Sequence, residues 1–157
     1  MRRAEPLRVD VQRGVRAWTP SGGKIAAWAA GALGARARSA ELAVRVVSAA
    51  ESRRLNARYR GKDRPTNVLS FPPPPLPPAA RAAPRPLGDL VICATVVREE
   101  AKAQSKPLEA HWAHLIVHGT LHLLGYDHER DRQAVRMERR EIAVLRRLGF
   151  NNPYRSR

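Results

Sequence analysis

The chain has 157 residues, with 29 lysines and arginines against 14 aspartates and glutamates, which gives a formal net charge of +15. This length fits a single domain, 1–157, with a core of its own, and the positive excess favours a polyanionic partner, most commonly nucleic acid. The single cysteine, Cys93, excludes an intrachain disulfide. The sequence also lacks an apolar leader and any run long enough to cross a bilayer, so we expect a cytoplasmic protein without a membrane or disulfide partner.

Apolar periodicity and capping residues predict alternating strands and helices along the chain. In order, these are a strand over 7–12, a helix from Thr19 and Pro20 to about residue 33, a strand over 41–47, a helix opened by Ser48 and Glu51, a strand over 66–71, a strand over 87–94, a helix to about Gln104, a long helix from Ser105 and Pro107, and a last helix from about Asp131 to Leu148. The strands are few and mixed in character. We therefore expect an α+β fold, a small mixed β-sheet flanked by helices.

Residues 72–86 consist mainly of proline and alanine. Proline lacks the amide hydrogen that a sheet ladder needs, so this stretch is predicted to be a proline-rich surface insertion in the domain. A spacer is favoured over a ligand for a proline-binding groove.

Three histidines near the carboxyl end form the most informative pattern, H-G-T-L-H-L-L-G-Y-D-H, which places His118, His122 and His128 at i, i+4 and i+10. The first two lie on one helix face, and a positive φ at Gly125 would end the helix and let His128 return to them. Three imidazoles leave one tetrahedral position open, as in catalytic zinc sites. We predict one Zn²⁺ ion in this C-terminal helical part, although other divalent transition metals also bind three imidazoles.

The neighbouring residues leave two alternatives open. The spacing resembles the metzincin protease motif H-E-x-x-H-x-x-G-x-x-H, but Gly119 stands where those enzymes have their glutamate base, which disfavours peptide hydrolysis. His111 and His114 lie upstream on the same predicted helix, and we expect them to have a structural role or to support the ligands, rather than to bind the ion. If one of them were a fourth ligand, the metal would be structural and the chain a non-catalytic basic ribosome-assembly factor.

Three sequence blocks in order resemble the YbeY family of bacterial endoribonucleases. They extend over about residues 40–154 in the expected order: N-A-R-Y-R-G-K-D-R-P-T-N-V-L-S-F-P from Asn56, G-D-L-V-I-C from Gly88, and H-G-T-L-H-L-L-G-Y-D-H-E from His118, followed by Met137, Glu141 and L-G-F-N-N-P-Y. The proline-rich segment departs from the family pattern.

The resemblance implies a metal-dependent, single-strand-specific endoribonuclease that acts in maturation of small-subunit ribosomal RNA (the 16S 3′ end) and in ribosome quality control. It implies a zinc-like ion on His118, His122 and His128, and the ribosome or its assembly factors as partners. It also assigns RNA cleavage to Arg60, which by itself would be interpreted as a surface ion-pair residue. No general base is identifiable, and Asp127 is better suited to the turn.

Overall fold

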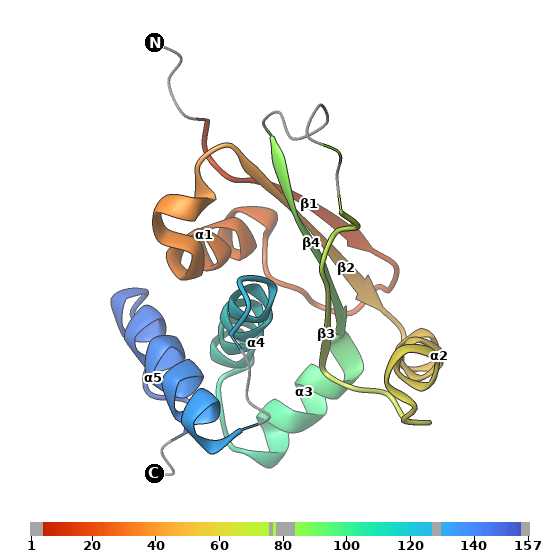
Figure 1. Cartoon of the computed structure of the whole chain (residues 1–157). Coiled ribbons are helices and arrows are strands. Elements are labelled where there is room, and N and C mark those ends of the chain that lie inside the picture. Colours follow the sequence, from red (N-terminus) through yellow and green to blue (C-terminus); the bar gives the residue numbers. More distant parts are fainter. Residues whose placement is uncertain (1–4, 76, 78–83, 127–129, 155–157) are drawn as a thin grey trace.

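The computed structural model describes residues 5–75, 77, 84–126 and 130–154 (Figure 1). In this part of the chain the elements follow one another as β1 (Arg8–Arg13), α1 (Gly22–Leu33), the short 3-10 helix η1 (Gly34–Ala37), β2 (Ala40–Val47), α2 (Ala49–Arg60), β3 (Val68–Phe71), β4 (Arg85–Cys93), α3 (Ala94–Ala103), α4 (Leu108–Leu123) and α5 (Asp131–Arg147). Helices flank a mixed sheet, which confirms the predicted fold class. None of these helices is long and apolar enough to cross a bilayer.

The described strands form one sheet in the order β1-β2-β4-β3. β1 and β2 are parallel, as are β2 and β4, whereas β3 runs antiparallel to β4. Parallel neighbours need a crossover connection, and α1 supplies the one between β1 and β2. Within the described residues β3 pairs with β4 on one side and is an edge strand of the sheet.

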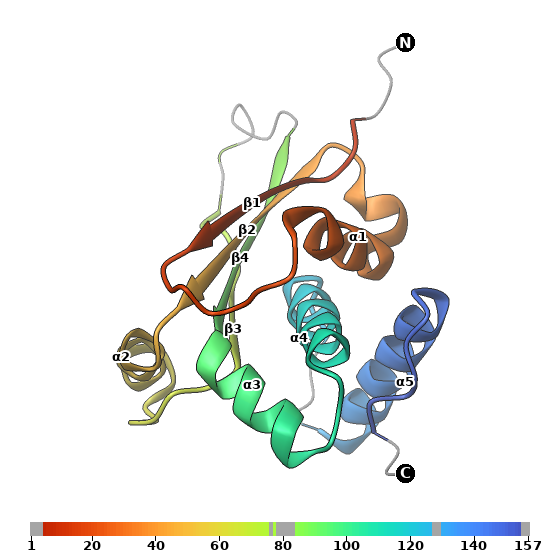
Figure 2. The same ribbon diagram turned by 180° about the vertical axis from the view of Figure 1, so that it is seen from behind.

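The side chains of β2 alternate between the two faces of the sheet, because successive strand residues point in opposite directions. Leu42, Val44 and Val46 are buried, whereas Glu41 and Arg45 are only partly covered on the other face. The buried side chains belong to the main core, which also contains residues of α1 and α4. Figures 1 and 2 show these two helices on the same side of the sheet.

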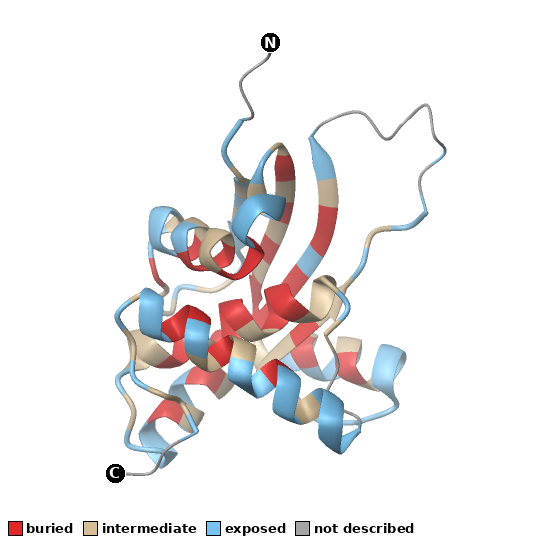
Figure 3. Ribbon diagram, turned by 60° about the vertical axis from the view of Figure 1, so that its left-hand side comes forward, coloured by how far each residue is buried: buried red, intermediate tan, exposed pale blue. Residues whose placement is uncertain are grey.

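α4 is the central helix of the fold. Trp112, Ile116 and Leu121 are at most 1% exposed, and buried positions occur nearly all around the helix. Figure 3 shows the buried residues of the molecule gathered where the helices meet the sheet. α4 contacts α1, α3, α5 and the strands β3 and β4. A helix that is apolar on almost every side must be surrounded in this way, so the segment that carries the histidines is held rigidly.

The opposite face of the sheet has a smaller apolar cluster under α2. Val47, Leu69 and Val91 are buried there, and Leu55 of α2 and Phe71 of β3 pack against them. α2 thus lies on the other side of the sheet from α1 and α4. The alternation along β3 therefore separates Leu69 and Phe71 from Val68, which belongs to the main core.

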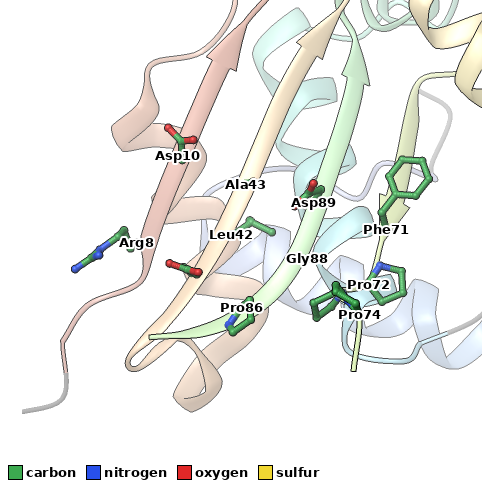
Figure 4. A pocket seen from close by; sticks show the side chains of 12 residues that line it. Arg8, Asp10, Leu42, Ala43, Phe71, Pro72, Pro74, Pro86, Gly88 and Asp89 are labelled. Atoms are coloured by element: carbon green, nitrogen blue, oxygen red, sulfur yellow. The ribbon is translucent and has the colours of Figure 1, made fainter. Parts of the chain in front are cut away.

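A groove of about 410 Å³ opens on this second face beside the cluster under α2. Its walls come from β1, β2, β4 and the prolines that follow β3 (Figure 4). Asp10, Glu41 and Asp89 bring carboxylates to the groove, and Arg8 brings one guanidinium group. The groove and the histidines therefore lie on different faces of the sheet.

The predicted start of the first helix is wrong by two residues. Ser21, not Thr19, caps α1, because the Ser21 hydroxyl accepts a hydrogen bond from the Lys24 amide at 3.2 Å. The Thr19 hydroxyl is instead bound to Arg13 Nε at 2.7 Å. A hydrogen bond from the last residue of β1 therefore occupies the hydroxyl that the local pattern favoured as the cap.

The predicted end of the proline-rich insertion is also wrong, because β4 already begins at Arg85 and includes Pro86. Pro86 lies opposite Glu41, and the register with β2 shifts directly after this pair. Such a bulge accommodates the missing amide hydrogen of proline in a strand. Pro72–Pro75, Pro77 and Pro84 have no strand or helix structure, as predicted.

Replacing Gly88 with Ala should lower the free energy of unfolding by about 2–4 kcal/mol. Gly88 has φ +126°, and an added Cβ would lie 2.4 Å from the Phe71 carbonyl oxygen. Urea denaturation measures the effect. Gly22→Ala is the matched control, because nothing lies within 4 Å of the added Cβ at the start of α1. That variant should be unchanged or more stable by up to about 1 kcal/mol, and equal losses in both would contradict the steric argument.

Candidate metal centre

α4 ends in a Schellman motif beside His122. The Gly125 amide donates to the His122 carbonyl at 3.0 Å, and the Tyr126 amide donates to the Leu121 carbonyl at 3.1 Å. Gly125 has φ +98°, which confirms the positive φ that the sequence predicted there. The backbone thus turns sharply within a few residues of the second histidine.

His118 and His122 lie one turn apart on α4, and both side chains are partly exposed. Their ring centroids are 5.3 Å apart and the rings are inclined by 73°. Two imidazoles that share one tetrahedral ion through Zn–N bonds of about 2.0–2.1 Å have centroids roughly 5 Å apart. The two rings therefore have a spacing that fits a shared metal ion.

A fully buried carboxylate, Glu141 of α5, lies behind His118. His118 Nδ1 is hydrogen-bonded to Glu141 Oε1, while Oε2 accepts from the Tyr154 hydroxyl and lies 3.1 Å from His114 Nε2. Taking a carboxylate out of water costs several kcal/mol unless donors surround it. Three donors from α4 and from the segment after α5 meet this requirement.

The protonation states in this cluster follow from the same contacts. Burial would raise the pKa of Glu141, but hydrogen bonds from His114 and His118 outweigh burial and lower it to about 2. Burial lowers the pKa of His114. Burial, with the hydrogen bond to Glu141, raises the pKa of the Tyr154 hydroxyl. Near neutral pH, Glu141 is therefore an ionised acceptor, and His114 and Tyr154 are neutral donors.

The contact with Glu141 determines which nitrogen of His118 can bind a metal. When Nδ1 donates its hydrogen to Glu141, the lone pair of the ring lies on Nε2. His114, His118 and Glu141 also offer ligand atoms that lie within 4.8 Å of one another, so this trio could itself hold an ion. In the described structure, however, both Glu141 oxygens already accept hydrogen bonds.

Gly119 follows His118 in sequence and lies on the face of α4 that packs against the sheet. A Cβ atom at this position would lie 2.8 Å from Leu90 Cδ2 and 3.3 Å from atoms of Ser70 and Val68. A side chain at position 119 would therefore require the Leu90 side chain and its neighbours on β3 to shift. Close packing thus accounts for the glycine, and the carboxylate that the metzincin motif needs is missing at this position.

The sequence matches known proteins along nearly its whole length. A family model described as Endoribonuclease YbeY matches residues 23–149. Over 154 residues the chain is 50% identical to Endoribonuclease YbeY of Halorhodospira halophila (strain DSM 244 / SL1), covering 96% of this chain and 98% of that protein. The chain belongs to the YbeY family. The resemblance inferred from the three sequence blocks is thereby confirmed.

A solved structure supports the fold alone. The solution structure of TM1509 from Thermotoga maritima matches with a TM-score of 0.53 and 23% identity, covering 95% of this chain and 99% of that one. At this identity the match says nothing about the site residues of the YbeY chain.

The structure brings together some of the residues that the YbeY resemblance singled out. His118 and His122 are neighbours on α4, whereas His128 and Asp127 lie outside the described residues. Arg60 is the last residue of α2 and is exposed. Figures 1 and 2 show β3 between α2 and α4, so the helix that Arg60 ends and the helix of the histidines lie on either side of this one strand.

His111 belongs to a different network, about two turns before His118 on α4. Its Nε2 lies 3.0 Å from Glu100 Oε1, and Glu100 also accepts from Asn67 Nδ2 at 3.1 Å. Burial would raise the pKa of Glu100, but the hydrogen bonds from His111 and Asn67 outweigh it and lower this pKa. The network joins α3 and α4 to the residue that precedes β3, which supports the structural role predicted for His111.

Sequence reasoning gave no role to Glu141 or Tyr154. A signal for Glu141 was present, since Met137, Glu141, Val144 and Leu145 are the buried positions of α5. A charged residue on the apolar stripe of an amphipathic helix needs a buried partner. No such pattern pointed to Tyr154, because only the path of the backbone after α5 brings the Tyr154 hydroxyl to Glu141.

Replacing Glu141 with Gln should weaken zinc binding about 10–100-fold, because His118 loses the charged acceptor that orients its ring. Competition with a chromogenic chelator measures the affinity. Glu138→Gln removes the same charge from an exposed position one turn earlier on α5 and should bind zinc as the wild type does. Unchanged affinity in E141Q would refute the orienting role, and complete loss of zinc would indicate that Glu141 is itself a ligand.

Proposed function

We propose that this chain is a metal-dependent endoribonuclease that cuts single-stranded RNA during maturation of small-subunit ribosomal RNA, at the 16S 3′ end. The observation that carries the proposal is the His118–His122 pair in a chain half identical to a protein named as an endoribonuclease. The net charge of +15 is consistent with a phosphate-rich substrate. The proposed location is the cytoplasm, and the proposed protein partners are the ribosome or its assembly factors.

The proposed ligands of one Zn²⁺ ion are His118, His122 and His128. Imidazole nitrogens suit zinc, and the ring spacing of the first two supports a shared ion. In this assignment Glu141 orients His118 by accepting from Nδ1, and His114 and Tyr154 hold Glu141 in place. When bound, the ion would supply Lewis-acid stabilisation of the charge that grows on the phosphate.

Arg60 is proposed to bind the phosphate that is cut. A guanidinium group offers a planar pair of donors that matches two phosphate oxygens, and it keeps its charge at any relevant pH. Arg60 ends α2 and is exposed, so its long side chain is accessible to a substrate. Lys62 and Arg64, exposed in the loop that follows, would contact neighbouring backbone phosphates without taking part in the chemistry.

His118→Ala and His122→Ala should each remove most of the bound zinc and abolish RNA cleavage, because two imidazoles hold the ion far more weakly than three. Metal content is measured by elemental analysis after zinc loading, and activity on single-stranded ribosomal RNA fragments beside a casein control. Arg147→Ala, an exposed change at the end of α5, should keep both. Full zinc content in both histidine variants would refute the ligand set, and degradation of casein with intact RNA would favour a protease.

Arg60→Glu should lower the rate of RNA cleavage at least about 100-fold, because it replaces a donor to the developing charge with a repelling carboxylate. Zinc content should not change, and stability should fall by no more than about 1 kcal/mol, because Arg60 is exposed and a carboxylate at the carboxyl end of α2 opposes the helix dipole. The matched control is Arg147→Glu, which alters net charge equally on a different helix. Cleavage at the wild-type rate in R60E would overturn the role assigned to Arg60.

A further inference from the structure

Tyr59 is an exposed aromatic residue at the carboxyl end of α2. It is 56% exposed, the highest value among the large exposed hydrophobic side chains in the described part of the chain. Its ring contacts Phe71 edge-on, with centroids 5.1 Å apart and an angle of 71°. The Arg58 guanidinium lies 5.3 Å from the ring centroid. Tyr59 is therefore held in place by its neighbours while much of its surface remains in water.

Phe71 connects Tyr59 to the helix of the histidines through β3. Leu69 and Phe71 face the α2 side of the sheet, whereas Ser70, between them, faces α4. The Ser70 hydroxyl donates to the Gly119 carbonyl at 3.1 Å, next to His118 in sequence. The end of β3 therefore has the aromatic pair on one side and the metal-binding helix on the other.

The surroundings of Tyr59 are strongly basic. Exposed cationic side chains follow one another from α2 into the next loop, at Arg54, Arg58, Arg60, Lys62 and Arg64. Asp63 is the only acidic residue in residues 54–64, and it is paired with Arg53 through two hydrogen bonds of 2.7 and 3.0 Å. An exposed aromatic face among cations is the usual surface for single-stranded nucleic acid, in which bases stack and phosphates pair with cations.

We propose that Tyr59 is a stacking platform for a base of the single-stranded RNA substrate, supported from beneath by Phe71. The exposed side chain of Arg58 can leave the ring and pair with an adjacent phosphate when a base arrives. The inference rests on the proposed function and deepens it: the substrate would cross the end of β3, with Tyr59 binding an unpaired base outside the cleavage centre. Tyr59 is a binding residue in this proposal, not a catalytic one.

The preference for unpaired RNA would follow from this arrangement. A base within a duplex is already stacked on both faces and cannot lie on the Tyr59 ring, whereas a single-stranded base can. Removal of the ring should therefore weaken binding of single strands and leave the weaker, electrostatic binding of duplexes unchanged. A stacked base also contributes no charge, so its loss should not change the salt dependence of binding.

The test compares Tyr59→Ala with Tyr59→Phe in the zinc-loaded full chain. Fluorescence polarisation measures binding of a labelled single-stranded DNA oligonucleotide, which stacks as RNA does but lacks the 2′-hydroxyl and is not an RNase substrate. We expect Y59A to bind about 5- to 100-fold more weakly. Y59F should bind as the wild type does, because it keeps the ring. The salt slope should stay the same in Y59A and fall by about 0.7 in Arg58→Ala, which removes one phosphate contact.

RNA cleavage kinetics separate this inference from the proposed function. Y59A should raise KM for single-stranded RNA with little change in kcat and none in zinc content. Unchanged oligonucleotide affinity and KM, with only a lower melting temperature, would mean that Tyr59 merely shields Phe71, and the platform would be refuted. If the wild type binds oligonucleotides through Tyr59 but cuts no RNA, the platform stands and the proposed function fails.

Discussion

The arrangement of the site depends on one buried carboxylate. Glu141 is 0% exposed, and such a group is tolerated only when donors replace the water it has lost. His118, His114 and Tyr154 supply those donors, so Glu141 joins α4, α5 and the segment after α5 at one point. The same contact that stabilises the fold orients the His118 ring and places its lone pair on Nε2 when Nδ1 donates to Glu141. In the proposed site, stability and metal binding would therefore depend on the same hydrogen bonds.

β3 is the second constraint, because it lies between α2 and α4, the helix that carries the histidines. The absence of a side chain on Gly119 lets α4 approach β3 closely enough for the Ser70 hydroxyl to reach the Gly119 carbonyl at 3.1 Å. Asn67, just before β3, is tied through Glu100 to His111 on α4. The chain leading from Arg60 is thereby anchored to the histidine helix at two points, although Arg60 itself lies on the other side of the strand.

Local patterns were sufficient for much of this structure. The i, i+4 spacing predicted that His118 and His122 lie on one helix face, and the glycine at position 125 predicted a helix end with a positive φ; the structure has both features. Side-chain contacts between different elements could not be predicted in this way. The Thr19 hydroxyl is bound to Arg13, and Ser21 caps α1 in its place. The Tyr154 hydroxyl reaches Glu141 because of the path of the backbone after α5. Such pairings depend on tertiary packing, which no residue spacing encodes.

Local charge then distinguishes the groove on the sheet from the end of α2, although the overall charge of the chain is +15. The groove on the open face of the sheet contains Asp10, Glu41 and Asp89 with a single arginine, Arg8, and its local field repels phosphate. The end of α2 has the opposite character, since its cations greatly outnumber its acids. The groove would therefore disfavour a bound polyanion, whereas the exposed cations at the end of α2 would attract one toward Tyr59 and Arg60. The carboxylates thus exclude the sheet groove from the proposed RNA path, a distinction that the positive charge of the whole chain does not make.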